Sequence, residues 1–402
     1  MNFAAPRTWA GIGFILLFLI NVGLVIAGLI FDNLWCTLSG MLMAITQFWL
    51  HERLLQKQNA LACYPLFSDA DLRMVIGRSQ TRVPLSNTGG EESVFDFGYR
   101  SVQCGETTLQ IAGNMLFTEI GMGNCRMPYR MNLLNIGLSN VDVPNKGSLL
   151  ALSRSAKTND CAINTGVVGI VPELLRGGSD LVWRIDRLEA LYRNPDGSFN
   201  EAVFGKAATR PYIKMIEVKL KAAHFSADIS ESSLNCLITF LERIKVLSGG
   251  KPTGVCLAVA DHELVARLCH VMASNVVYLD FVTIESTPGD GDVDALFAAI
   301  NAARLAIDAQ ALPTKVIASG DLAKERDILR AIGYGAHACY SVRPFQVSLA
   351  AARGLIRSTT NSKVASVTAF HQNTLAATMQ LITACATQPQ QAVEQEPISA
   401  AN

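Results

Sequence analysis

Short apolar runs alternate with amphipathic stretches through the second half of the chain, and this rhythm constrains the fold more than any other feature. Several runs are rich in β-branched residues and are bounded by Gly, Pro or Asp, which is typical of buried parallel strands. The segments between them repeat apolar residues at spacings of three and four, which predicts helices. Strands are expected at residues 133–138, 161–164, 181–185, 213–220, 254–260, 278–284, 314–319 and 337–342.

Eight strands alternating with helices predict an α/β fold in which residues 131–386 form a (β/α)8 barrel of the TIM type. An open doubly wound sheet is the alternative, but no G-x-G-x-x-G follows any predicted strand. The Gly-x-Gly pairs at residues 11–13 and 121–123 lack a third glycine, so we expect no NAD(P) site on this chain. The clearest helices are predicted at 231–247, 262–273, 292–312 and 322–333.

Two long apolar segments open the chain, at residues 9–31 and 34–50, with only Asp32 and Asn33 between them. Crossing a bilayer core takes about 20 apolar residues, so the first segment is long enough and the second is marginal. The pattern predicts a transmembrane helical hairpin within residues 1–57. A signal peptide is the rival interpretation, but a second apolar segment follows where a cleavage site would be expected.

The cations flanking this hairpin predict its orientation. Arg7 precedes the first segment, Arg53 and Lys57 follow the second, and the turn contains neither Lys nor Arg. Positive flanks favour the cytoplasmic side, so we expect two helices in the inner or cytoplasmic membrane and the barrel on the cytosolic side. If the second segment were interfacial, the body would instead be exported.

Charge and cysteine content narrow the function classes. The chain has 34 Lys+Arg against 34 Asp+Glu, and this balance argues against nucleic-acid binding. None of the ten cysteines forms a Cys-x-x-Cys pair, so we expect reduced, mostly buried thiols. His262 and His270 have no third ligand in view, so no metal site is predicted.

Two segments outside the predicted barrel have their own character. Residues 58–130 contain few long periodic runs and are expected to form an irregular N-terminal layer packed on the barrel. Residues 387–402 are rich in Gln and Pro and are predicted to be a disordered tail.

Chemistry in a barrel of this type belongs at the C-terminal ends of the strands. Lys219 and Lys221 end the fourth predicted strand, and strand alternation would point one inward and the other to solvent. Lys219 is therefore a candidate for binding an anionic substrate or a cofactor phosphate. His224 is the only histidine placed to act as an acid or base, which makes Lys219 and His224 the weak catalytic candidates.

The loops after the seventh and eighth strands of such barrels often hold a phosphate. Ser319 and Gly320 end the seventh predicted strand, and Gly335 and Ala336 precede the eighth. Glycine lets backbone N–H groups approach an anion, and Arg343, which follows the eighth strand, could add a bidentate charge. Turn formation alone is the alternative explanation for these glycines.

Residues 133–377 resemble the FMN-binding synthase domain of glutamate synthase, in its stand-alone, membrane-anchored branch. Each matching piece is short, and the collinear order of the pieces carries the resemblance. The pieces are Asn135-Ile136 with Ser139, 164–166, 178–183, 196–199, 214–220, 280–283, 318–320, and 332–339 with Ser341 and Arg343, preceded by Tyr64-Pro65.

The resemblance implies an FMN barrel that reduces 2-iminoglutarate to glutamate beside an iron–sulfur cluster. It places cofactor contacts at Asn135, Ser139, Lys219, Ser319, Gly320, Gly335, Ala336 and Arg343. The sequence departs from the family in three places. The family's Lys-x-x-Gln-Gly-Ala-Lys-Pro-Gly reads as residues 219–227 without the amide and second lysine, Cys256 replaces a lysine, and residues 286–292 replace a glycine-rich loop.

Residues 344–380 contain no cysteine, so we expect no iron–sulfur cluster. We therefore predict a membrane-tethered, catalytically degenerate barrel that acts as a partner or regulatory subunit, with a protein partner or as a homo-oligomer. The first alternative is an FMN-dependent oxidoreductase with an altered substrate and an external electron donor. The second is a small-molecule sensor or an unrelated barrel.

Overall fold

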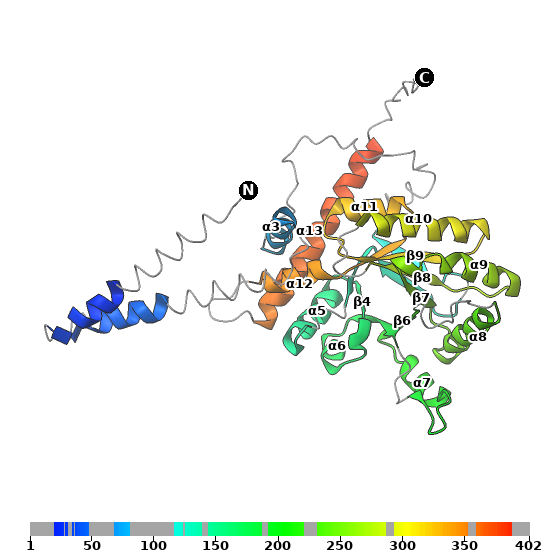
Figure 1. Ribbon diagram of the computed structural model, residues 1–402, viewed down its shortest axis with the longest axis horizontal. Helices are drawn as coiled ribbons and strands as arrows, with labels where there is room; N and C mark the ends of the chain where they lie inside the picture. Colours follow the sequence, from blue (N-terminus) through cyan, green and yellow to red (C-terminus); the bar gives the residue numbers. More distant parts are fainter. Residues whose placement is uncertain are drawn as a thin grey trace, which may run out of the picture. The chain divides into compact units, whose positions relative to one another are not determined.

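The computed structural model divides the chain into two compact units, residues 1–65 and 66–402, which are treated separately. Figure 1 shows the elements with their labels. The structure describes residues 20–27, 29–30, 34–35, 37–47, 68–80, 116–123, 125–138, 144–186, 192–220, 231–286, 293–352 and 359–387.

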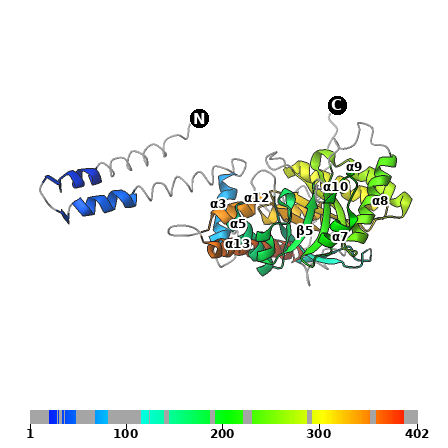
Figure 2. The ribbon, with the colours of Figure 1, turned by 90° about the horizontal axis from the view of Figure 1, so that it is seen from below.

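Residues 20–27 and 37–47 of the first unit are helical, and Figure 2 shows these two segments side by side. Asn21 Nδ2 donates a hydrogen bond to Gln47 Oε1 at 2.8 Å, and both side chains are buried between the segments. Among the residues that the structure describes, no helix is both long and apolar enough to cross a bilayer. The predicted transmembrane hairpin therefore finds no support there, although much of its first segment lies outside the described residues.

A closed barrel of eight parallel strands forms the centre of the second unit, as predicted, with the strand order β10-β3-β4-β5-β6-β7-β8-β9. Each predicted strand corresponds to one strand of this barrel. The strands are β3 (Leu134–Gly137), β4 (Ala162–Asn164), β5 (Asp180–Ile185), β6 (Ile213–Lys219), β7 (Thr253–Ala258), β8 (Phe281–Glu285), β9 (Lys315–Gly320) and β10 (Ala338–Ser341).

Helices between the strands surround the barrel. All four of the clearest predicted helices are present, and α8 has the predicted bounds. The helices are α5 (Lys146–Thr158), α6 (Pro172–Gly177), α7 (Glu201–Ala208), α8 (Glu231–Leu247), α9 (Leu264–Asn275), α10 (Val293–Ala309), α11 (Glu325–Gly333) and α12 (Arg343–Ala350), with short 3₁₀ turns η1 (Gly166–Val168) and η4 (Val259–Asp261).

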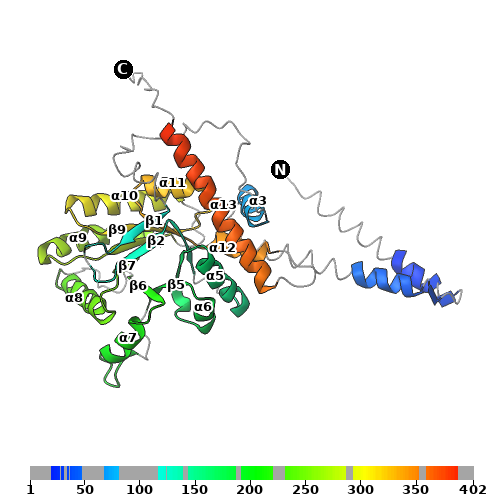
Figure 3. The same cartoon turned by 180° about the vertical axis from the view of Figure 1, so that it is seen from behind.

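A β-hairpin closes the end of the barrel where the strands begin. The hairpin consists of β1 (Phe117–Ile120) and β2 (Tyr129–Asn132), which pair antiparallel directly before β3. Figure 3 shows these two strands across the barrel. Ile120 and Met131 pack against inward-facing strand residues including Val182, Met215 and Phe281, and all are fully buried. The closed, apolar end leaves the other end for polar chemistry.

Two further helices cover one side of the barrel. The helix α13 (Thr360–Thr387) packs against α5, α11 and α12, and α3 (Asp69–Gln80) packs against α12 and α13. Buried His371 of α13 bonds through Nε2 to the carbonyl oxygen of Leu134 at 2.9 Å. The predicted layer at residues 58–130 is thus described only in α3 and the hairpin, while nearly all of the predicted tail lies outside the described residues.

Candidate functional site

The barrel interior changes from apolar to polar along each strand. Side chains at alternate positions of a strand share a face, so Val182 and Arg184 in β5, or Met215, Glu217 and Lys219 in β6, point into the same interior. The first position of each set belongs to the apolar layer above the hairpin. Later positions bring charged groups to the C-terminal mouth of the barrel, where chemistry is found in this fold.

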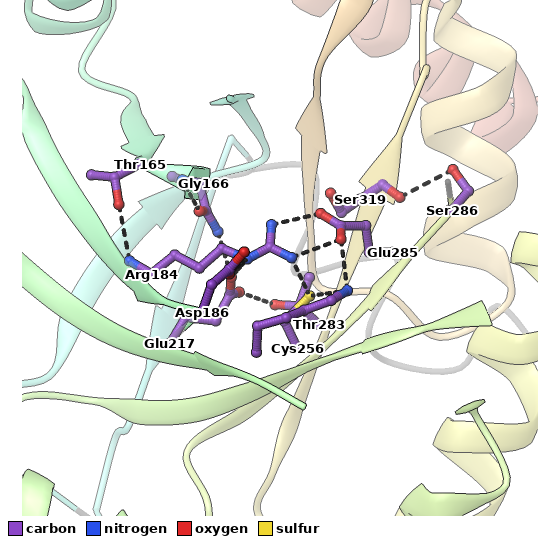
Figure 4. A network of polar contacts seen from close by, with 12 residues as sticks. Thr165, Gly166, Arg184, Asp186, Glu217, Cys256, Thr283, Glu285, Ser286 and Ser319 are labelled. Carbon is purple, nitrogen blue, oxygen red and sulfur yellow. Dashed lines mark hydrogen bonds and ion pairs between the residues drawn. The ribbon is translucent and has the colours of Figure 1, made fainter. Parts of the chain in front are cut away.

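Glu285, the last residue of β8, lies at the centre of a charged network in the mouth (Figure 4). Its Oε1 accepts from Arg184 Nη1 at 2.6 Å and its Oε2 from Arg184 Nη2 at 2.7 Å. Lys219 Nζ donates to the same Oε2 at 2.7 Å. Burial disfavours the carboxylate, but these two cations outweigh it and hold the pKa of Glu285 at about 2. Because β8 is a neighbour of neither β5 nor β6, the contacts cross the barrel.

Cys256 of β7 lies under the same two cations. Its Sγ is 3.2 Å from Arg184 Nη2 and 3.4 Å from Lys219 Nζ. Burial is the largest effect on this thiol and, together with the acids Glu285 and Glu217, raises its pKa well above the ordinary value despite the cations. The sequence comparison puts Cys256 where a lysine is expected, and the structure brings the Lys219 ammonium next to that position.

Glu217 forms a second, deeper layer of the network. Its side chain is fully buried, Oε2 accepts from Asn164 Nδ2 at 2.8 Å, and Oε1 accepts from Thr283 Oγ1 at 2.6 Å. Arg184 Nε lies 3.6 Å from Oε2. Burial nonetheless raises the pKa of Glu217 above its ordinary range, with the charge of Glu285 acting in the same direction. The carboxyl group is thus held in place by neutral donors more closely than by a cation.

A second ion pair lies where β9 and β10 end. Asp321 follows β9, and its Oδ2 accepts from Arg343 Nε at 2.7 Å, while its Oδ1 accepts from the backbone N of Arg343 at 3.2 Å. Arg343 is the first residue of α12 and is buried. Gly320 ends β9, and a Cβ at that position would lie 2.5 Å from Ser286 Oγ. An anionic group therefore already occupies the helix end beside Arg343.

The structure separates the predicted cofactor residues into different places. Lys219, Ser319, Gly320 and Arg343 lie at or beside strand ends of the mouth, although Lys219 and Arg343 are both held by internal acids. Gly335 and Ala336 lie in the turn before β10, where the strand begins. They are therefore at the opposite end of the barrel and do not share a phosphate with Ser319 or Gly320.

Asn135 is also placed differently from the prediction. Its Nδ2 donates to the backbone oxygens of Asn132 and Cys339, and its Oδ1 accepts from the backbone N of Ala162. The side chain is fully buried and ties neighbouring strands together, so it offers nothing to a cofactor. Ser139 and His224 lie outside the described residues.

Three residues of the charged network were not predicted from the sequence: Arg184, Glu217 and Glu285. We expected the mouth to have lost family cations, through the missing second lysine and Cys256, and to keep Lys219, but we did not expect Arg184 to join Lys219 there. A usable signal was present, since charged residues two positions apart inside an apolar strand, such as Glu217 and Lys219, must face the same interior. The inward direction of Arg184 follows from the same alternation.

An open hollow of about 390 Å³ lies between α8 and α9 on the outer wall, beside Glu231, Arg267 and His270. It brings together fewer charged groups than the barrel mouth. No three His, Cys, Asp or Glu side chains of the described residues are arranged to hold a metal ion.

The fold and the site define a class: a (β/α)8 barrel with a charged centre at its C-terminal mouth. No family model matches the chain and no curated protein matches it, so membership of the glutamate synthase family is not shown. Solved structures with a similar fold include a mandelate oxidase with (S)-2-phenylpropionate, at 14% identity over 66% of this chain and 77% of that chain, with a TM-score of 0.43.

Two others are a lactate oxidase from Pediococcus acidilactici and a mutant flavocytochrome b2 with pyruvate bound. They have 15% and 13% identity over 66% of this chain, 75% and 68% coverage of their own chains, and TM-scores of 0.42 and 0.44. A further mandelate oxidase variant carries a monooxide FMN adduct. Likeness at this level carries no argument about activity, and the barrel assignment rests on the closed sheet itself.

Proposed function

We propose that the chain is an FMN-dependent oxidoreductase whose reaction takes place at the C-terminal mouth of the barrel. The convergence of Arg184, Lys219, Cys256 and Glu285 on that mouth carries the proposal. Burying several charged groups together is costly, and such networks concentrate at functional sites. A mouth that served only as a scaffold would be more stable with apolar side chains there.

The residues after β9 and β10 include groups of the kind that bind a phosphate such as that of FMN. A guanidinium, the first turn of α12 and a glycine backbone lie together, and the carboxylate of Asp321 already stands against Arg343 as an anion would. A bound phosphate would take the place of Asp321, with Arg343, Gly320 and Ser319 as its contacts. The proposal therefore requires the phosphate to displace Asp321 from Arg343.

The cations of the mouth can interact with the ring of the cofactor, at the end away from the phosphate. Bound FMN would supply hydride or electron transfer, and its ring gains negative charge on reduction. Lys219 and Arg184 are within the barrel interior and can offset that charge, while Glu217 lies beneath them as a buried carboxyl group. The chain's own contribution is therefore charge balance and a site shielded from water on its lower side.

The first experiment is the absorbance spectrum of the purified full-length protein before and after incubation with FMN and gel filtration. The proposal expects flavin bands that stay with the protein and that bleach and recover on anaerobic reduction and reoxidation. A colourless protein that retains no FMN would overturn it. That result would instead favour the degenerate partner expected from the sequence, which has no support from the comparisons.

We also propose that residues 20–47 sit in a lipid bilayer. The support is an inverted distribution of polarity: Asn21 and Gln47 face each other in the interior, while the side chains of Ile30 and Trp35 are 71% and 82% exposed. Thr46 Oγ1 donates a hydrogen bond to the backbone oxygen of Leu42 at 2.9 Å, within its own helix. Helices in lipid place apolar groups outward and polar groups between helices.

Flotation of the full chain with vesicles of mixed zwitterionic and anionic phospholipid tests this second proposal. We expect the chain to float, and Leu42→Asp to weaken its association. Leu305→Asp changes a similarly exposed leucine on α10 and should have no effect. A full chain that stays monodisperse in buffer and does not float would contradict the proposal.

A further inference from the structure

We infer that the ligand taken at the barrel mouth is a cationic, amine-bearing small molecule, bound by Asp186 and Glu285, and not a dicarboxylate. The inference rests on the proposed function for its location and adds the charge class of the substrate. It starts from the depth of the four charged groups. Side chains of Asp186 and Glu285 are 25% and 22% exposed, whereas those of Arg184 and Lys219 are 6% and 10% exposed.

This ordering decides which charge an incoming molecule meets. The carboxylates are the more accessible groups, and the cations lie beneath them against Cys256. A ligand entering from the mouth therefore meets the side chains of Asp186 and Glu285 before those of Arg184 and Lys219. Electrostatic attraction at a partly buried site depends most on the charged groups that the ligand reaches directly, because the local dielectric constant is low.

The cations are already engaged by groups of the protein. Arg184 uses Nη1 and Nη2 on Glu285, and Lys219 uses Nζ on Glu285. A carboxylate ligand would have to remove Glu285 from both, leaving that half-buried acid without a partner. Such an exchange gains one charge pair and loses another, so it gives little net binding.

The acids retain capacity for a donor. Asp186 Oδ1 is a buried atom that accepts no hydrogen bond from the described residues, although Arg184 Nε is 3.2 Å away. Arg184 Nε is a donor that also makes no hydrogen bond to these residues, so its contact with Asp186 is an ion pair that leaves the lone pairs of Oδ1 unused. An ammonium group has three donors and would satisfy Asp186 and a free lone pair of Glu285 together. Among the described residues, the charged groups that these ion pairs connect are Arg184, Lys219, Glu217 and the two acids.

Calorimetric titration of the full-length protein with 1,5-diaminopentane and with glutarate tests the inference, because the two probes share a chain length and carry opposite charges. We expect the diamine to bind and glutarate to give no heat of binding. Both titrations are run with and without FMN. The protein's flavin spectrum then reports on the proposed function separately from the charge preference, so either can fail alone.

Two substitutions locate the binding. Asp186→Asn should weaken diamine binding about tenfold or more while leaving the Arg184–Glu285 pair in place. Glu285→Gln should weaken diamine binding as well and, by freeing Arg184 and Lys219, should create measurable glutarate binding. The matched control is Glu201→Gln, which removes an acid paired with Arg243 on the outer surface.

Three results would overturn the inference. One is glutarate binding more tightly than the diamine to the unmodified protein. Another is diamine binding that Asp186→Asn does not change. The last is an equal loss in Glu201→Gln, which would show that the diamine binds only to surface acids. If Glu285→Gln fails to fold, Asp186→Asn still decides the outcome.

Discussion

Arg184 and Glu285 form a bidentate ion pair across the barrel interior, with N···O distances of 2.6 and 2.7 Å between strands that are not neighbours in the sheet. Lys219 binds the same carboxylate. The pair joins β5 to β8 and sets the charge of the mouth. Because Arg184 is buried and bonded twice to Glu285, loss of one partner of the pair should destabilise the fold.

Arg184→Met should destabilise the protein strongly. The substitution leaves Glu285 with Lys219 alone and removes the only cation beside Glu217 among the described residues. Breaking a buried pair from one side costs about 3–5 kcal/mol. Urea unfolding measures the loss, and Arg243→Met is the control, because its pair with Glu201 is exposed and should be worth less than about 1 kcal/mol.

A loss of less than about 1 kcal/mol in Arg184→Met would contradict this account of the mouth. Such a result would mean that water reaches Glu285 freely. The ion pair would then contribute no more to the free energy of unfolding than an exposed pair does, despite its position inside the barrel.

Stability should fall between neutral and mildly acidic pH because of His371. Burial lowers the pKa of His371 to about 4, while the unfolded side chain has its usual value near 6.5. Because the folded pKa is depressed, the contribution is complete above about pH 6.5 and is lost as the pH falls toward 4, with a total of about 3 kcal/mol. His337, whose pKa burial lowers to about 3, acts in the same direction.

His371→Gln checks this assignment, because the amide can keep a donor near the carbonyl oxygen of Leu134 but does not titrate in this range. Urea unfolding at several pH values should show a smaller decline for the variant than for the unmodified protein. Equal slopes for the two proteins would show that His371 is not buried in the folded state. The pH dependence that remains reports on His337 and on the carboxyl groups.

Gly166→Ala should damage the loop after β4. Gly166 has a φ of +51°, and a Cβ there would lie 1.9 Å from the carbonyl oxygen of Leu138. Its backbone N donates to Asn164 Oδ1, and Asn164 in turn holds Glu217. We expect a loss of about 2 kcal/mol or more in unfolding free energy.

Gly178→Ala provides the matched control for that substitution. Gly178 also has a positive φ, of +80°, but nothing lies within 4 Å of its added Cβ. The backbone penalty alone is about 1 kcal/mol. If thermal unfolding shows equal losses for the two variants, the close approach of Leu138 is not a real constraint.

Asp321→Asn should strengthen FMN binding. The substitution removes the carboxylate that holds Arg343 and that would repel a phosphate. Flavin fluorescence during titration measures the effect, and Asp294→Asn is the control, because Asp294 pairs with Arg330 on the exposed surface. Weaker binding in Asp321→Asn would show that Asp321 supports the cofactor site and does not compete for it.

Most of the barrel was predictable from the sequence, because its signals are local. Runs such as 254–260 are apolar and bounded by turn residues, and the helix at 231–247 has clear apolar spacing. The hairpin under the barrel was not predicted, since β1 and β2 have only four residues each. Short strands that depend on tertiary contacts give little periodic signal.

The site was only partly predictable, because its contacts join distant strands. Lys219 was expected at the mouth and lies there, but its partner Glu285 is 66 positions away along the chain. Glycine content misled the prediction at Gly335, where the turn precedes the strand and so lies at the wrong end of the barrel. Asn135 matched a family motif, yet its side-chain amide is hydrogen-bonded to backbone groups.

An equilibrium titration of the full-length protein with FMN tests the central proposal most directly. We predict quenching of flavin fluorescence that saturates near one FMN per chain and is about tenfold or more weaker in Arg343→Gln, with Arg243→Gln unchanged. Equal FMN affinity in Arg343→Gln and the unmodified protein, or no quenching at any concentration, would contradict the proposal that this barrel holds FMN at its mouth.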